Sequence, residues 1–265
     1  MPSHLNILFI GDIVGSPGLE LAATLIPNYL KKYEIDFLVV NGENVTEGKG
    51  ISEEHAKKIF DLGAHVITTG NHVWDRWDSR KVLGGDRRIL RPMNYPKENG
   101  GNGFLVVDLG EKGKAAVLNL QGRVYMQAID DPFKTADWVL SKIHEETSII
   151  LVDFHADATA EKMAMGWHLD GKVSAVLGTH THIPTADGRI LPRGTAYQTD
   201  VGMTGPYDSV LGMKKDLAIR RLMLSTPHKY EVASHDVRIA GVFVCADRQT
   251  GRAEKMESFV FPSFS

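Results

Sequence analysis

Short apolar runs that each end in Gly, Asp, Asn, Glu or His recur along this chain, and they constrain its fold more than any other feature. The first three runs are residues 5–10, 37–40 and 65–68, and the segments between them have helical spacing of apolar residues. One of these segments opens with Ser52-Glu53-Glu54-His55, which is typical of a helix start with acids in its first turn. This βαβαβ series predicts three adjacent parallel strands in an α/β fold.

The second half of the chain departs from a purely parallel arrangement. Residues 104–109 and 115–120 flank Gly110-Glu111-Lys112-Gly113, which predicts an antiparallel hairpin. A second hairpin is expected near the C-terminus, where alternating apolar residues in 237–244 and 256–261 flank a turn at 247–251. Between the hairpins we expect a helix and two strands, at residues 132–144, 149–153 and 173–177. The sheets should therefore be mixed.

Length and composition favour an ordinary globular chain. Its 265 residues exceed the usual size of a domain, but α/β folds often reach about 250 residues as one unit, so we predict a single domain over residues 1–265. The hydrophobic share of 43% is enough for a large core. With 30 basic and 33 acidic residues, the formal charge of −3 argues against binding to duplex nucleic acid but leaves a small nucleotide open.

The N-terminus and the single cysteine indicate a cytoplasmic setting. The start of the chain leads directly into the first apolar run, without the basic flank and cleavage site of a secretory signal. No apolar stretch approaches the roughly 18 residues that span a bilayer, so no membrane partner is expected. Cys245 lies in an apolar run, where a buried strand residue is a better interpretation than a nucleophile.

Five of the predicted strands end in polar groups that can ligate a metal. In open α/β sheets, ligands bind outside the carboxyl ends of the strands. The groups are Gly11-Asp12, Gly42-Glu43-Asn44, Gly70-Asn71-His72, Phe154-His155 and Gly178-Thr179-His180-Thr181-His182. Carboxylate, amide and imidazole ligands together suit Mn, Fe, Zn or Mg, and the lack of clustered cysteines excludes a thiolate zinc finger or an iron–sulfur site.

These motifs resemble the calcineurin-like metallophosphoesterases over nearly the whole chain. That family has an Asp after its first strand, a Gly-Asp after the second, a Gly-Asn-His after the third, and a later His and His-x-His. Asp12, Glu43 and Asn71 lie 31 and 28 residues apart, in keeping with βαβ units of about 30 residues. The resemblance implies the fold of that family, a four-layer α/β/β/α sandwich of mixed sheets flanked by helices.

Two departures from the general pattern narrow the resemblance. The first motif lacks the usual His, because it reads Asp12-Ile13-Val14, and the second has Glu43-Asn44 where the family usually has Asp. Together with the segment 199–209, these substitutions look like the bacterial YmdB-like subgroup, which is regarded as cyclic-nucleotide phosphodiesterases. The implied substrate is a small phosphodiester, with 2',3'-cyclic nucleotides as the best candidates.

The resemblance also implies a role for each motif residue. Glu43 would bridge two metal ions, Fe, Mn or Zn, with Mg a weaker fit. One ion would be completed by Asp12, Asn44 and His182, and the other by Asn71, His155 and His180. Asn44 would then replace the missing His. A metal-activated hydroxide would attack phosphorus, and His72 would act as general acid on the leaving oxygen.

Each of these residues also has a structural interpretation when taken alone. Asp12 or Asn71 could close an Asx turn, and Glu43 could be a solvated acid. His180 and His182 would point to one side of an extended segment, and it is the joint pattern that favours a metal site. Trp74 and Trp77 could stack on a base or belong to the core. The remaining histidines match no ligand position and are predicted to be structural: His4, His55, His65, His144, His168, His228 and His235.

Two other functions remain open from the sequence. The same hydroxide could attack a monoester, which would make the protein a phosphomonoesterase or a protein phosphatase. A regulatory protein could instead use the metal site to hold a nucleotide or an RNA end, with incidental turnover. A homo-oligomer is compatible with the resemblance, but the sequence carries no interface signature that identifies one.

Overall fold

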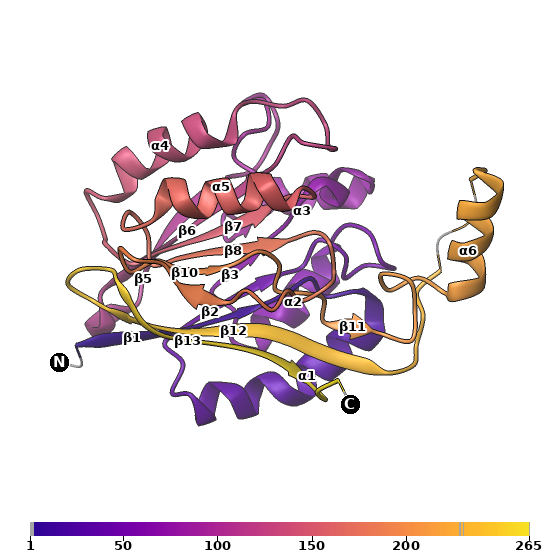
Figure 1. The fold of residues 1–265 in the computed structure, drawn as a ribbon, viewed down its shortest axis with the longest axis horizontal. Coiled ribbons are helices and arrows are strands. Elements are labelled where there is room, and N and C mark those ends of the chain that lie inside the picture. Colours follow the sequence, from indigo (N-terminus) through magenta and orange to yellow (C-terminus); the bar gives the residue numbers. More distant parts are fainter. Residues whose placement is uncertain (1–2, 228, 230, 265) are drawn as a thin grey trace.

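The computed structural model describes residues 3–227, 229 and 231–264, which form two sheets packed face to face between helices (Figure 1). The first sheet has the order β11-β12-β1-β2-β3-β4, with β13 paired to β12. Its strands are β1 His4–Ile10, β2 Phe37–Asn41, β3 Val66–Thr68, β4 Ile89–Leu90, β11 Gly205–Pro206, β12 Val237–Asp247 and β13 Ala253–Phe261. Strands β1, β2 and β3 are parallel neighbours, and β12 and β13 form a hairpin, as predicted.

The second sheet has the order β5-β6-β7-β8-β10-β9. Its strands are β5 Phe104–Asp108, β6 Lys114–Gln121, β7 Ile150–His155, β8 Ala175–Thr179, β9 Arg189–Ile190 and β10 Ala196–Gln198. Strands β5 and β6 form the predicted antiparallel hairpin around the short 3₁₀ helix η2 Gly110–Lys112, whereas β6, β7 and β8 are parallel. Both sheets are therefore mixed.

The helices cover the outer faces of the two sheets. Helices α1 Gly15–Lys32, α2 Glu53–Asp61 and α3 Trp77–Gly85 accompany the first sheet, and α4 Pro132–Ile143 and α5 Thr159–Leu169 the second (Figure 1). Because side chains alternate along a strand, inner strands such as β1 and β7 contribute to two cores. Phe9 and Leu151 pack between the sheets, while Leu8 packs towards α1 and Val152 towards α4 and α5. This is the predicted four-layer sandwich.

Local signals in the sequence explain where several helices begin. The Ser52 hydroxyl accepts a hydrogen bond from His55 N and caps α2, as its sequence indicated. Asp131 caps α4 in the same way, with Pro132 at the first helical position. Helix α1 begins at Gly15, so the turn after β1 is shorter than the stretch 11–18 suggested by its glycines.

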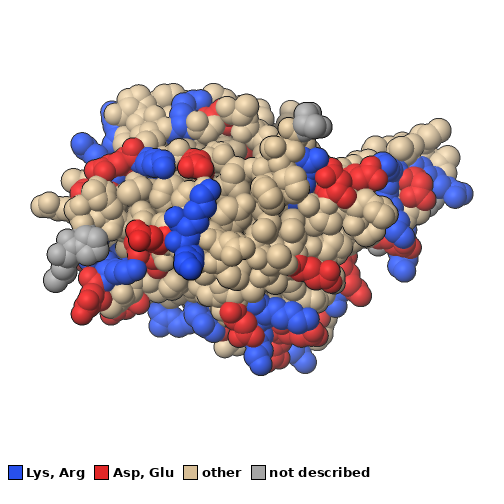
Figure 2. Space-filling model, turned by 90° about the horizontal axis from the view of Figure 1, so that it is seen from below, with Lys and Arg blue, Asp and Glu red and all other residues tan. Residues whose placement is uncertain are grey.

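Helix α6 Lys215–Leu224 projects away from the body of the molecule (Figure 1). In the view from below, basic and acidic side chains are interspersed over the body and over this projection (Figure 2). That face carries no continuous patch of one sign among its described residues. Within the ranges described, none of the helices has the length and apolar character that crossing a bilayer requires.

Candidate metal centre

The carboxyl ends of strands from both sheets bring the predicted ligands together. Those of the first sheet follow β1 and β2 or begin η1 Asn71–Trp74, the 3₁₀ turn after β3. In the second sheet, His155 is the last residue of β7, and His180 and His182 lie in the loop that follows β8. All seven predicted metal ligands belong to one contiguous hydrogen-bonded cluster, made of Asp12, Glu43, Asn44, Asn71, His155, His180 and His182.

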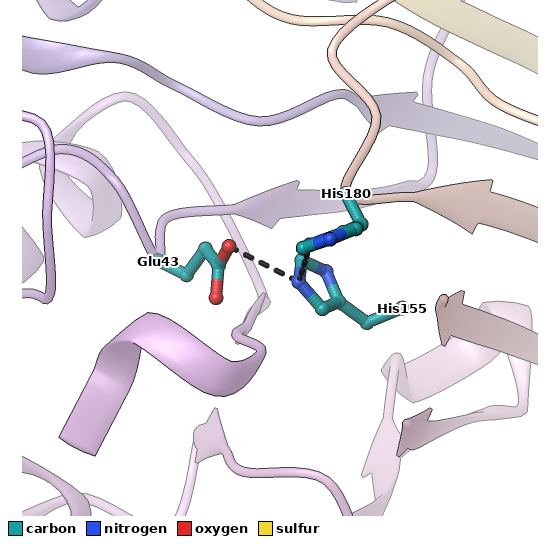
Figure 3. Close-up of side chains that lie close together, drawn as sticks. All are labelled: Glu43, His155 and His180. Carbon is teal, nitrogen blue, oxygen red and sulfur yellow. Dashed lines mark hydrogen bonds and ion pairs between the residues drawn. The ribbon is translucent and has the colours of Figure 1, made fainter. Parts of the chain in front are cut away.

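His155 is the centre of one half of this cluster (Figure 3). Its Nε2 atom lies 3.1 Å from Glu43 Oε1, 3.0 Å from Asn71 Oδ1 and 3.1 Å from His180 Nδ1. One ligand atom from each of Glu43, His155 and His180 lies within 4.8 Å of the other two. This half matches the set Asn71, His155 and His180 that the resemblance implies for one metal ion, with Glu43 beside it.

The other half of the cluster is built around Asn44. Its Nδ2 atom lies 3.1 Å from Glu43 Oε1 and 3.1 Å from His182 Nε2. The resemblance assigns Asp12 to this half as well, while its Oδ2 atom accepts a hydrogen bond of 3.3 Å from His180 N of the first half. Glu43 therefore stands between the two halves, which is the position that a bridging carboxylate needs.

Two buried oxygens in the cluster have no hydrogen-bond donor among the described residues. They are Asp12 Oδ1 and Asn44 Oδ1, on side chains that are at most 1% exposed. Buried polar atoms are nearly always paired, so the orphaned Asp12 oxygen beside an imidazole cluster calls for a cation. The Asn44 oxygen would reach the same site once its carboxamide turns, because Nδ2 now faces Glu43 and His182. The donor set thus fits the metal ions that the resemblance implies.

The charges of the cluster shift the pKa values of its members in opposite directions. Burial raises the pKa of Asp12, and the nearby Glu43 charge adds to this effect. Burial by itself would lower the pKa of His155, but the carboxylates of Glu43, Asp12 and Asp153 together outweigh it and raise that pKa to about 9. Burial and the charge on His155 lower the pKa of His180 to about 3.

A buried network behind the ligands fixes the orientation of His155. Thr179 Oγ1 lies 2.9 Å from His155 Nδ1 and donates a hydrogen bond of 2.7 Å to Asp153 Oδ1. Asn41 Nδ2 donates to the other Asp153 oxygen, and Asn41 Oδ1 accepts from Glu43 N. The network thus links His155 to the backbone of Glu43 across the two sheets. The sequence analysis did not predict the supporting role of Thr179, Asp153 and Asn41. The only signal in the sequence was that these polar residues lie in or next to apolar runs.

The loop that carries His180 and His182 is not extended. Both residues have left-handed backbone conformations, with φ of 98° and 65°, so the predicted extended segment is wrong. A buried ion pair supports this loop, in which Lys162 Nζ lies 2.6 Å from Asp200 Oδ2 and donates to Thr179 O. Asp200 also accepts from Thr181 N. The two imidazoles reach the cluster through this strained loop, because such conformations persist only where the surroundings enforce them.

Gly70 leaves the space in which Asn71 and His155 meet. A Cβ atom at this position would lie 2.3 Å from His155 Nε2 and 2.5 Å from Glu43 Oε2. No side chain fits at that distance, so the glycine before Asn71 is required by the close approach of the two sheets.

His72, the predicted general acid, lies at the edge of the cluster. Its backbone N donates to Glu43 Oε2 over 3.1 Å, and its ring Nδ1 lies 2.9 Å from Asp75 Oδ2. The side chain is 31% exposed, whereas Glu43 and His155 are fully buried. A partly exposed imidazole beside a buried ligand set is accessible to a substrate.

The described histidines outside the cluster have structural partners or lie on the surface. His4 pairs with Glu254, and His168 with Asp137. His55, His65, His144 and His235 belong to capping, strand and loop positions away from the cluster, and His228 lies outside the described residues. Cys245 lies in β12 as predicted, but it is partly exposed and not buried. Burial still raises the pKa of its thiol, which argues against a nucleophile.

Comparison with known proteins agrees with the predicted family and with the fold. Residues 8–259 match the family model of YmdB-like proteins. A Bacillus subtilis protein named 2',3'-cyclic-nucleotide 2'-phosphodiesterase is 45% identical over 96% of both chains. This relationship confirms the predicted enzyme class, a phosphoric ester hydrolase.

Two solved structures have the same architecture over nearly their full length. A protein described as a novel phosphatase from Mycoplasma pneumoniae superposes with a TM-score of 0.92 at 34% identity, over 98% of this chain and 94% of its own. A hypothetical protein from Thermus thermophilus gives a TM-score of 0.90 at 35% identity, over 97% of this chain and 99% of its own. On the match to the family model and the identity to the Bacillus relative, the chain belongs to the YmdB-like family.

Proposed function

We propose that this protein is a metal-dependent phosphodiesterase that hydrolyses small phosphodiesters, with 2',3'-cyclic nucleotides as its substrates. The observation that carries the proposal is the cluster that joins seven ligand-type side chains around Glu43, with buried oxygens of Asp12 and Asn44 left unpaired. The name of the Bacillus relative supports the substrate class.

Two metal ions fit the two halves of the cluster. Asn71, His155 and His180 would hold one ion, and Asp12, Asn44 and His182 the other, with Glu43 shared. Asn44 would turn its carboxamide so that the oxygen faces the ion, because the amide O and N exchange places on rotation about the last side-chain bond. Carboxylate, amide and imidazole ligands suit Fe, Mn or Zn, whereas Mg is a weaker fit.

The proposed mechanism gives the metal ligands and His72 different roles in hydrolysis. When bound, the metal ions supply Lewis-acid chemistry that activates water and neutralises charge on the phosphoryl oxygens. His72 donates a proton to the leaving oxygen, and Asp75 holds its ring through Nδ1, so the proton comes from Nε2. Glu43 fixes the backbone of His72 through its hydrogen bond and so places the acid beside the ligand set.

Hydrolysis of 2',3'-cyclic AMP and bis(p-nitrophenyl) phosphate by metal-loaded protein tests the proposal. We expect turnover by the wild type and its loss after chelation and in Glu43→Ala. His72→Ala should lower kcat by about 10²–10⁴-fold while metal content is retained. His168→Ala is the matched control, because His168 pairs with Asp137 away from the cluster, and it should keep full activity. Metal-replete wild type that hydrolyses neither diester would refute the proposal.

The phosphomonoesterase alternative is kept because the Mycoplasma structure is described as a phosphatase. Comparing p-nitrophenyl phosphate with bis(p-nitrophenyl) phosphate separates the two ester classes. A higher kcat/KM on the monoester would favour the phosphatase. The cytoplasmic location stays a prediction from the sequence, and a homo-oligomer stays compatible with the resemblance.

A further inference from the structure

A cavity of about 540 Å³ opens beside Trp74. Trp74 and Tyr95 give it an aromatic wall, and Gln127, Ala128 and Ile129 line it from the loop after β6. Its volume falls within the range of small-molecule pockets, which is about 300–1,000 Å³.

Two residues of the cavity lining lie next to elements of the candidate metal centre. Trp74 is the last residue of η1, the turn that begins with Asn71 and includes His72. The Tyr95 hydroxyl lies 2.9 Å from Gln121 Oε1, and Gln121 pairs in register with His155 on the neighbouring strand. Burial raises the pKa of Tyr95 to about 12, and the charge of Glu43 adds to this effect. Trp74 and Tyr95 therefore connect the cavity to the cluster.

The walls of the cavity are held in place before any ligand arrives. The Asn94 carboxamide donates to Gln121 O and Asp130 O, and it accepts from Gln121 N. It thereby fixes both ends of the loop 122–130. The Tyr95 hydroxyl also lies 2.6 Å from Gln127 Oε1 in that loop. Such preorganisation lowers the entropic cost of binding.

The lining has the chemistry that a nucleoside requires. The Trp74 and Tyr95 rings, with centroids 5.1 Å apart, and Ile129 offer an apolar surface to a planar ring. Gln127 presents a carboxamide, which can both donate to and accept from a base edge.

We propose that this cavity is the nucleobase subsite of the enzyme. Trp74 and Tyr95 form the apolar wall against which the base lies, and Gln127 contacts its edge. The assignment rests on the proposed function, which places the phosphodiester at Glu43 and His72. It adds residues that bind the part of the substrate remote from the reacting bond.

The test compares substrates with and without a base. Ala128→Trp fills the cavity, and Ala23→Trp on the exposed face of α1 is its matched control. We expect Ala128→Trp to lower kcat/KM for 2',3'-cyclic AMP about tenfold or more. Hydrolysis of 1-O-methylribose 2',3'-cyclic phosphate, which has no base, should stay within about twofold of wild type in both variants. Gln127→Ala should also lower kcat/KM for 2',3'-cyclic AMP relative to kcat/KM for the substrate without a base.

An equal loss on both substrates, or no loss on cyclic AMP, would overturn the subsite. A wild type that hydrolyses neither substrate would instead refute the proposed function, and calorimetric titration with adenosine would then decide on the subsite. Adenosine binding that is lost in Ala128→Trp and kept in Ala23→Trp supports the subsite. Wild type that does not bind adenosine, or an Ala128→Trp variant that binds it equally well, overturns it.

Discussion

Asp12 illustrates how a proposed metal ligand destabilises the protein when no metal is bound. Its buried carboxylate has an unpaired oxygen, and both burial and the Glu43 charge disfavour its ionised form. Asp12→Asn removes that charge. We expect it to raise the melting temperature of the chelated protein by about 2–4 °C, which corresponds to about 1 kcal/mol at this chain length. The rise in melting temperature on adding Mn²⁺ should shrink in the same variant. Calorimetry with and without metal measures both, and a chelated variant that melts below chelated wild type would contradict this account.

Thr179 acts on the centre through His155 and not by direct ligation. Its hydroxyl lies between His155 Nδ1 and Asp153 Oδ1, so Thr179→Val keeps the shape of the side chain but frees the imidazole ring. Loss of such a supporting hydrogen bond lowers metal affinity by about 10–100-fold. Chelator competition measures the affinity, and Thr179→Ser, which retains the hydroxyl, should bind metal like wild type. Unchanged affinity in Thr179→Val would show that His155 is oriented by other contacts.

Helix α5 is tied to the ligand loop by the Lys162–Asp200 ion pair. Both side chains are buried, so Lys162→Met leaves the Asp200 carboxylate without its partner. We expect a loss of about 3–5 kcal/mol in the free energy of unfolding by urea. The double variant Lys162→Met/Asp200→Asn should be more stable than Lys162→Met, because it buries no unpaired charge. A double variant that is less stable than Lys162→Met would contradict this explanation.

At the scale of elements, the sequence predicted where the strands end, but it did not predict the side-chain contacts that support the residues at those ends. Asp12, Glu43 and Asn71 were found because each follows an apolar run, and parallel strands place such ends at one sheet edge. The contacts of Thr179, Asp153 and Lys162 could not be found in this way, because their partners are distant in sequence and lie in other elements. The left-handed loop at His180 was missed for a similar reason, since its shape depends on Asp200.

At the scale of the whole molecule, the centre lies where the two sheets meet. Glu43 belongs to the first sheet and His155 to the second, while the core between the sheets includes Phe9 and Leu151. A ligand that binds only the folded state stabilises it by RT ln(1 + [L]/Kd), about 4 kcal/mol at a thousandfold excess over Kd. Metal should therefore stabilise both halves of the chain together.

The predicted single domain can be tested through this coupling. Trp74 and Trp77 lie with the first sheet, whereas Trp138 and Trp167 lie on the helices that cover the second. In the variant Trp138→Phe/Trp167→Phe, tryptophan fluorescence comes only from Trp74 and Trp77 and reports on the first sheet and its helices, while circular dichroism reports on the whole chain. Because the two sheets share one core, we expect the two probes to give the same urea midpoint, in metal-loaded and in chelated protein. Chelation should lower both midpoints equally, and midpoints that separate on chelation would mean that the two sheets unfold as independent units.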